Sequence, residues 1–408
     1  MKFKKLTAMV LVLGMMFSIA ACSTSGTETT TANTTTATTT KATEQTTVQS
    51  TSEVSSEPIR IGLAVALTTD ANLGDIFTIR GAEMAVDEIN ANGGIDGRQI
   101  EVYKEDTANT PAACINAYNK LIEENAVVAI IGPSYSSQLL AIQPIVTEKK
   151  IPVFGLGTNV KLTQDFPWYI RMRPSDAIAA KAAAEFALNS LGKQKIGVSY
   201  VSNEFGMGGK DIIVETLKEY GIEPVAIETY NTEDRDYSAL LYKMQEAGAD
   251  VLINWGNQQN DAALWVQNKK LETNIPMISC PGSLAQSALD IAEGASNGNY
   301  AVTDVMLATK EDQKIKDWCK KYEDMYGEIP EPHVNAAYDA VYLIKYGIEK
   351  SGSTDAKAII DEILALRDYQ GISGTFSFSQ GTGDGLSSVD IIQFDKKTPV
   401  FVDHIEAN

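Results

Sequence analysis

The chain has 408 residues, with 34 Lys or Arg against 53 Asp or Glu, which gives a net charge of −19. A protein this acidic repels the phosphates of nucleic acids, so we expect no nucleic-acid partner. Only two histidines occur, His333 and His404, which disfavours a histidine-based metal site, and we expect neither a metal nor a cofactor. The cysteines show neither metal-site spacing nor a disulfide framework; they are Cys22, Cys114, Cys280 and Cys319.

Residues 1–21 have the pattern of a secretory signal peptide. Lysines lie within residues 2–5, and the apolar run Leu6–Ala21 follows them. This run is shorter than the roughly 20 apolar residues that a membrane span needs, and small residues precede a cleavage point. The junction that ends in Ala20-Ala21-Cys22 resembles the lipobox of bacterial lipoproteins, in which the cysteine carries the lipid. We therefore predict lipid attachment at Cys22, with a plain signal peptide as the alternative.

The segment 22–57 is predicted to be a disordered tether. From Ser23 to Glu57 there are no aromatic residues, and 21 of 35 positions are Ser or Thr. Such a composition offers too little apolar surface to offset the entropy lost on ordering. A lipid on Cys22 would then hold a globular domain near a membrane without fixing its orientation.

Beyond the tether, short apolar runs alternate with longer amphipathic segments. Near-continuous Val/Ile runs are typical of strands buried on both faces, and their alternation with helices predicts parallel βαβ units. The predicted strands are 59–67, 126–132, 151–156, 195–201, 224–230, 250–255 and 275–279. The predicted helices are 77–91, 112–124, 137–149, 176–191, 208–220, 237–247, 260–270 and 284–292.

Eight segments, in the expected order, resemble type I periplasmic binding proteins, above all the branched-chain amino-acid (Leu/Ile/Val) receptors of ABC importers. The opening segment 59–113 contains IRGAEMAVDEINANGGIDGRQIEVYKEDTANTPAA, and 127–145 reads VVAIIGPSYSSQLLAIQPI. The other segments are 151–164, 169–186, 196–222, 235–253, 336–352 and 370–378. The resemblance covers essentially the whole domain.

The resemblance implies an α/β protein of two doubly wound parallel-sheet lobes, joined by three hinge crossovers, that close over a ligand (a Venus-flytrap). Lobe I would comprise 58–177 and 306–385, and lobe II would comprise 178–305 and 386–408. The implied function is that of an extracytoplasmic, lipid-anchored monomer. It would bind a small carboxylate-bearing solute, such as a branched-chain amino acid, and deliver it to ABC permease subunits.

The loop from Gly132 to Ser137 is the first candidate for ligand binding. It follows a buried strand and enters a helix, whose N-terminal N–H groups and partial positive charge suit an anion. Ser at such a position is equally a routine helix cap. By resemblance, Ser136 contacts the ligand α-carboxylate and Ser137 assists it.

Four further residues are site candidates by resemblance. Thr158 would hold the same carboxylate through its hydroxyl and N–H, and Leu156 would offer its carbonyl to the ligand ammonium. Phe205 lies at a strand-to-helix turn, where its ring either covers the apolar part of the ligand or anchors the helix. Gln258 stands where the family often has an aromatic residue.

Pro281 departs from the family pattern. It occupies the position of the acidic residue that pairs with the ligand ammonium, and proline offers neither charge nor donor. Either the ligand lacks an α-ammonium, or another acid supplies the charge, with Glu204 and Asp304 as candidates. A ligand such as an amide, a keto acid or an aromatic acid therefore stays open.

Enzymes and ligand sensors are the two functional classes that compete with transport. We expect no enzyme, because the sequence has no G-x-S-x-G elbow and no convincing acid/base pair. A ligand sensor of the same fold that docks a separate signalling partner stays an alternative, because fold does not determine function.

Overall fold

The computed structural model describes residues 57–68, 73–284, 286–307, 310–378 and 381–407. All of them belong to one compact unit of the chain, Val54–Asn408. The predicted signal peptide, Cys22 and nearly all of the predicted tether lie outside the described residues. Within the described part, no helix combines the length and the apolar character needed to cross a bilayer.

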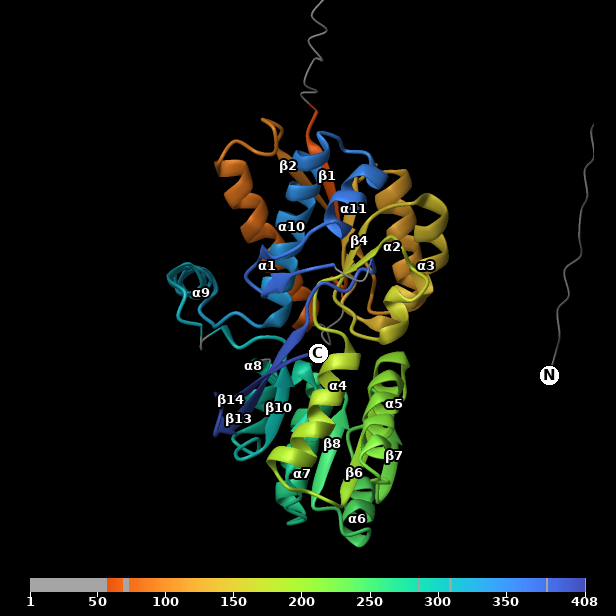
Figure 1. Cartoon of the computed structure of the whole chain (residues 1–408), viewed down its shortest axis with the longest axis vertical. Helices are drawn as coiled ribbons and strands as arrows, with labels where there is room; N and C mark the ends of the chain where they lie inside the picture. Colours follow the sequence, from red (N-terminus) through yellow and green to blue (C-terminus); the bar gives the residue numbers. More distant parts are fainter. Residues whose placement is uncertain (1–56, 69–72, 285, 308–309, 379–380, 408) are drawn as a thin grey trace, which may run out of the picture. The chain divides into compact units, whose positions relative to one another are not determined.

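The first sheet has five parallel strands in the order β2-β1-β3-β4-β5. Its central strands are buried because helices cover both faces. Figure 1 shows α1 and α10 on one side of these strands and α2 and α3 on the other. The strands are β1 (Ile59–Val65), β2 (Ile100–Asp106), β3 (Ala129–Ile131), β4 (Val153–Gly155) and β5 (Tyr169–Arg171). The helices between them are α1 (Leu73–Ala91), α2 (Pro111–Glu123) and α3 (Ser136–Lys149), with a 3-10 turn η1 (Val160–Thr163).

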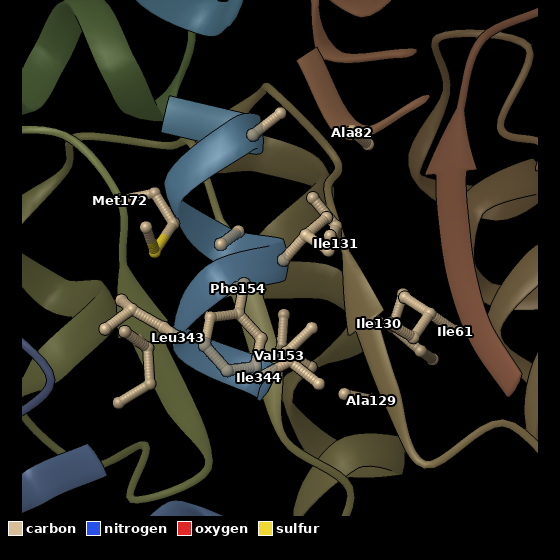
Figure 2. Packing of buried hydrophobic residues seen from close by; sticks show 14 of the residues in the cluster. Ile61, Ala82, Ala129, Ile130, Ile131, Val153, Phe154, Met172, Leu343 and Ile344 are labelled. Carbon is tan, nitrogen blue, oxygen red and sulfur yellow. The ribbon is translucent and has the colours of Figure 1, made fainter. Parts of the chain in front are cut away.

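Three helices from much later in the chain complete the first lobe. They are α9 (Gln313–Tyr326), α10 (Pro332–Ser351) and α11 (Ala356–Leu364), and a small hairpin of β11 (Tyr369–Gln370) and β12 (Thr375–Phe376) follows. Helix α10 packs against α1 and α11. In Figure 2, Leu343 and Ile344 of α10 gather with Phe154 and Val153 of β4, and all four are fully buried in one core.

The second sheet has seven strands in the order β14-β13-β10-β9-β8-β6-β7. Five are parallel, and β13 and β14 add an antiparallel edge. The strands are β6 (Ile196–Val201), β7 (Ala226–Tyr230), β8 (Val251–Trp255), β9 (Met277–Ser279), β10 (Tyr300–Thr303), β13 (Ser388–Asp395) and β14 (Thr398–Glu406). The helical segments are α4 (Asp176–Glu185), η2 (Phe186–Ser190), α5 (Glu204–Glu219), α6 (Ser238–Glu246), α7 (Gln258–Lys270), η3 (Pro281–Leu284) and α8 (Gln286–Ala292).

Strand β8 shows why this second sheet is buried on both faces. Successive side chains of a strand point to opposite faces. Ile253 and Trp255 join the core beneath α4 and α5, whereas Leu252 joins a separate core with α6 and α7. All of these side chains are fully buried, and the buried Asn254 is the polar residue among them.

The chain passes between the two sheets three times: after β5, after β10 and before β13. The expected fold class is therefore confirmed. We propose to keep the lobe boundaries expected from the sequence, with lobe I formed by 58–177 and 306–385 and lobe II by 178–305 and 386–408.

Candidate ligand-binding site

A pocket of about 560 Å³, part of it open to solvent, lies where strands of both sheets end. This is the edge of a parallel sheet at which ligands bind. The lining residues from lobe I and the first crossover are Ser134, Tyr135, Ser136, Ser137, Leu156, Gly157, Thr158, Arg173 and His333. Those from lobe II are Asn203, Phe205, Gly256, Asn257, Gln258, Cys280, Pro281 and Gly282. All six predicted ligand contacts are thus brought together in one pocket.

Ser136 is the first residue of α3, and it is buried. The residue that caps this helix is Tyr135, whose side chain makes no capping hydrogen bond. Ser136 instead uses its Oγ to accept a hydrogen bond of 3.3 Å from the backbone N–H of Asn159. The alternative that Ser136 is merely a helix cap is therefore wrong. The start of α3 faces the pocket without a side-chain cap, which suits an anion.

The loop before α3 is held from behind by Asp75. Ser134 donates a hydrogen bond from its Oγ to Asp75, and the backbone N–H of Ala66 donates to the same carboxylate at 2.7 Å. Gly132 in this loop has a φ of 90°, and a Cβ there would lie 2.4 Å from the carbonyl oxygen of Ala64. Only glycine fits such a position. Asp75 and Gly132 therefore hold the loop that leads into Ser136 and Ser137.

The loop that carries Thr158 is fixed by Arg171, which sequence reasoning missed. The buried Arg171 guanidinium donates to the carbonyl oxygens of Gly157 at 2.9 Å and Asn159 at 3.0 Å. Its Nε donates to Asp384 at 2.5 Å. Thr158 itself is buried, and its carbonyl oxygen accepts from the backbone N–H of Asp176 at 2.9 Å.

On the lobe II side, the pocket wall is formed by helix starts. Phe205 is partly buried, with its ring 6.2 Å from the ring of Trp255, so it both lines the pocket and anchors α5. Gln258 begins α7 directly after its capping residue Asn257. Pro281 is buried and lies in the pocket wall, as the sequence comparison with the family implied.

The two acids proposed to replace the missing ammonium partner are placed differently. Glu204 has an exposed side chain that is not among the lining residues, although its carbonyl oxygen accepts a hydrogen bond of 2.5 Å from the side chain of Asn159 in the other lobe. Asp304 is buried, and both its oxygens bind Arg173, at 2.5 Å and 3.1 Å. No Asp or Glu is among the described residues that line the pocket.

Arg173 and His333 are lining residues that the sequence gave no reason to connect. The Nη1 of Arg173 lies 3.3 Å from the Nε2 of His333, and the Nδ1 of His333 lies 2.9 Å from a carboxylate oxygen of Glu331. Arg173, His333, Glu331 and Asp304 are all buried. Across the described ranges, no group of three or more His, Cys, Asp or Glu side chains is placed to hold a metal ion.

Comparison with known proteins identifies a family. A family model described as periplasmic binding protein matches residues 58–399. The Leu/Ile/Val-binding protein homolog 3 of Brucella melitensis is 29% identical over 357 residues, which covers 83% of this chain and 91% of that protein.

Solved structures share the fold. The branched-chain amino acid transporter substrate binding protein LivJ of Streptococcus pneumoniae, in complex with isoleucine, matches with a TM-score of 0.80 at 22% identity. This match covers 86% of this chain and 99% of LivJ. A solute binding protein from Rhodopseudomonas palustris, in complex with 3,4-dihydroxybenzoic acid, matches with a TM-score of 0.78 at 18% identity, over 86% of this chain and 98% of that one. Proteins with this fold thus take different ligands.

Proposed function

Because the chain belongs to the periplasmic binding protein family, we propose that it is an extracytoplasmic receptor for a small carboxylate-bearing solute. It captures the solute in the pocket between the two lobes and delivers it to an ABC import permease. Branched-chain amino acids and related compounds are the class that the relatives' names support.

One observation carries this proposal. The uncapped start of α3 and the Thr158 loop converge on a single pocket, together with Ser136 and Ser137. Backbone N–H groups at a helix start, with hydroxyl donors beside them, suit a carboxylate. The residues that hold this carboxylate are Ser136, Ser137 and Thr158. The carbonyl of Leu156 is a hydrogen-bond acceptor for the ligand. The side of the ligand that faces lobe II is covered by Phe205 and Gln258.

Calorimetry on two variants tests the proposed carboxylate site. Removing a hydrogen bond to a charged group costs about 1.5–3 kcal/mol, or about 10- to 100-fold in affinity. We expect that loss in Ser136→Ala and in Thr158→Val, for the solute that most raises the melting temperature in a screen of amino acids, keto and hydroxy acids, amides and aromatic acids.

Ser238→Ala is the matched control. Ser238 is likewise the first residue of a helix, α6, but it is not a lining residue of the pocket. Its substitution should leave solute affinity unchanged. Wild-type affinity in both Ser136→Ala and Thr158→Val would remove the proposed carboxylate site.

We also propose that the mature protein is a monomer anchored to the membrane through lipid on Cys22. The support is the basic segment, apolar run and lipobox-like junction at the N-terminus. In cells, Cys22→Ala should yield a protein that is either released or left unprocessed. A Cys22→Ala protein that matures to the wild-type size and stays with the membrane would contradict the anchor.

A further inference from the structure

The buried guanidinium of Arg173 lines the pocket and has N–H donors without an acceptor in the described part of the chain. It is 7% exposed and lines the pocket. Arginine has five N–H donors. Asp304 accepts two of them, from Nε at 2.5 Å and Nη2 at 3.1 Å, and His333 lies 3.3 Å from Nη1. One N–H on Nη1 and one on Nη2 therefore have no acceptor among the described residues.

His333 offers no hydrogen-bonding atom to a ligand, because both its ring nitrogens already have partners. Glu331 binds the Nδ1 of His333 at 2.9 Å, and its other oxygen accepts from the backbone N–H of His333 at 2.9 Å. The Nη1 of Arg173 can only donate, so the Nε2 of His333 accepts and its Nδ1 carries the hydrogen. The Nε2 of His333 is then the acceptor that faces Arg173, and it has no lone pair to offer a ligand.

An α-ammonium has no counter-charge in this pocket. No Asp or Glu is among the described lining residues, Pro281 occupies part of the wall, and Asp304 is held by Arg173. The Leu156 carbonyl brings no counter-charge, and burying an ammonium without one is costly. An ammonium only donates, so it could not accept from the free N–H groups of Arg173. A group beside Arg173 has to be a hydrogen-bond acceptor.

A second anion fits this wall less well than an uncharged acceptor. Asp304 and Glu331 bring two negative charges to the buried cluster, whereas Arg173 brings one positive charge. An additional carboxylate would add to this excess of negative charge. A carbonyl or hydroxyl oxygen accepts the free N–H groups without doing so.

We propose that the ligand is a carboxylate that carries, in place of an α-ammonium, an uncharged oxygen which accepts hydrogen bonds from Arg173. Small 2-oxo and 2-hydroxy acids with an apolar side chain form this class, and the ring of Phe205 meets the side chain. This inference rests on the proposed function, namely that the pocket holds a carboxylate at Ser136 and Thr158.

The test is calorimetry with four compounds of one carbon skeleton: leucine, 4-methyl-2-oxopentanoate, 2-hydroxy-4-methylpentanoate and 4-methylpentanoate. The oxo and hydroxy acids should each bind about 10- to 100-fold more tightly than 4-methylpentanoate, because a hydrogen bond to a charged donor is worth that factor. Leucine should bind more weakly than the oxo acid by at least about tenfold.

Arg173→Lys identifies the donor. Lysine keeps a positive charge for Asp304 but loses the planar fork of N–H groups. The preference for the oxo acid over 4-methylpentanoate should fall to near one, while the affinity for 4-methylpentanoate changes little. The control is Arg80→Lys, since Arg80 pairs with Glu328 and is not a lining residue. A variant that fails to fold leaves the wild-type series as the test.

The outcomes distinguish a wrong ligand class from a wrong carboxylate site. Leucine binding as tight as or tighter than the oxo acid, lost in Ser136→Ala, would overturn the inference and leave the carboxylate site standing. An equal loss for all four compounds in Arg173→Lys would also overturn it. If none of the four binds, the inference falls, and the proposed function falls with it only if the wider screen yields no carboxylate.

Discussion

Asp176, the first residue of α4, is a residue near the pocket whose ionisation opposes folding. It is fully buried just after the first crossover. Burial raises the pKa of its carboxyl from 3.8 to about 6, although Thr158 and the charges of Arg171 and Arg173 act in the opposite direction. The folded protein therefore keeps this proton at pH values at which the unfolded chain has released it.

This shift predicts a pH dependence of stability. Since the folded state binds the extra proton, the free energy of unfolding should fall as pH rises from about 4 to about 6, by up to about 3 kcal/mol. Asp176→Asn should remove this part of the dependence and be the more stable protein at pH 7, as measured by urea unfolding across pH.

Asp211→Asn serves as the control for this effect, because the Asp211 side chain is 69% exposed. It should show the same pH dependence as the wild type. If Asp176→Asn were less stable than the wild type at pH 7, attraction from Arg171 and Arg173 would outweigh the burial of the carboxylate.

Side chains of the pocket were predictable from sequence where a local pattern marks them. Ser136 and Thr158 each follow a short apolar strand, so their placement at a strand end could be anticipated. Arg173 and His333 could not be linked in this way, because 160 residues separate them and they meet through the return of α10 to the core of lobe I. The positioning role of Arg171 likewise depends on the tertiary path of the Thr158 loop.

At the scale of elements, α5 lies between the core of lobe II and the surface that faces lobe I. A Cβ on Gly209 would lie 2.1 Å from the Cδ1 of Trp255, which is buried. A Cβ on Gly208 would instead lie 2.4 Å from the side-chain nitrogen of Asn159, across the cleft. Adjacent glycines thus serve two different contacts.

Comparing Gly209→Ala with Gly208→Ala separates these contacts. Both changes gain helix propensity of about 1 kcal/mol, so their difference isolates packing. Overpacking against Trp255 should leave Gly209→Ala about 1–3 kcal/mol less stable than Gly208→Ala in chemical unfolding of the ligand-free protein. Gly208→Ala should instead weaken solute binding, because it displaces the contact of Asn159 with Glu204. Equal stability of the two variants would contradict this division.

All seven strands predicted from apolar runs are present in the structure. Strand β2 was missed because it lies at a sheet edge, where half of its side chains are charged and few are buried. Strands β13 and β14 were missed because they form an antiparallel edge of the seven-stranded sheet and so lie outside the βαβ pattern. Helix α5 starts at Glu204, earlier than the predicted 208, because Asn203 caps it by accepting from the N–H of Gly206 at 2.9 Å.

At the scale of the whole domain, each lobe is built from separate stretches of the chain. Helices α9 to α11 return to the first sheet's core, and β13 and β14 return to the second sheet. We propose that the lobes rotate about the three crossings between them while the pocket residues stay fixed on their own sheets. The contact of Asn159 with Glu204 joins the two lobes in the structure described here.

The most direct test of the central claim is a crystal structure of the protein grown with 4-methyl-2-oxopentanoate or with leucine, whichever binds more tightly. We predict one molecule between the lobes, with its carboxylate within hydrogen-bond distance of Ser136 and Thr158 and its apolar part against Phe205. A ligand bound elsewhere on the domain, or one whose carboxylate points away from the start of α3, would contradict it.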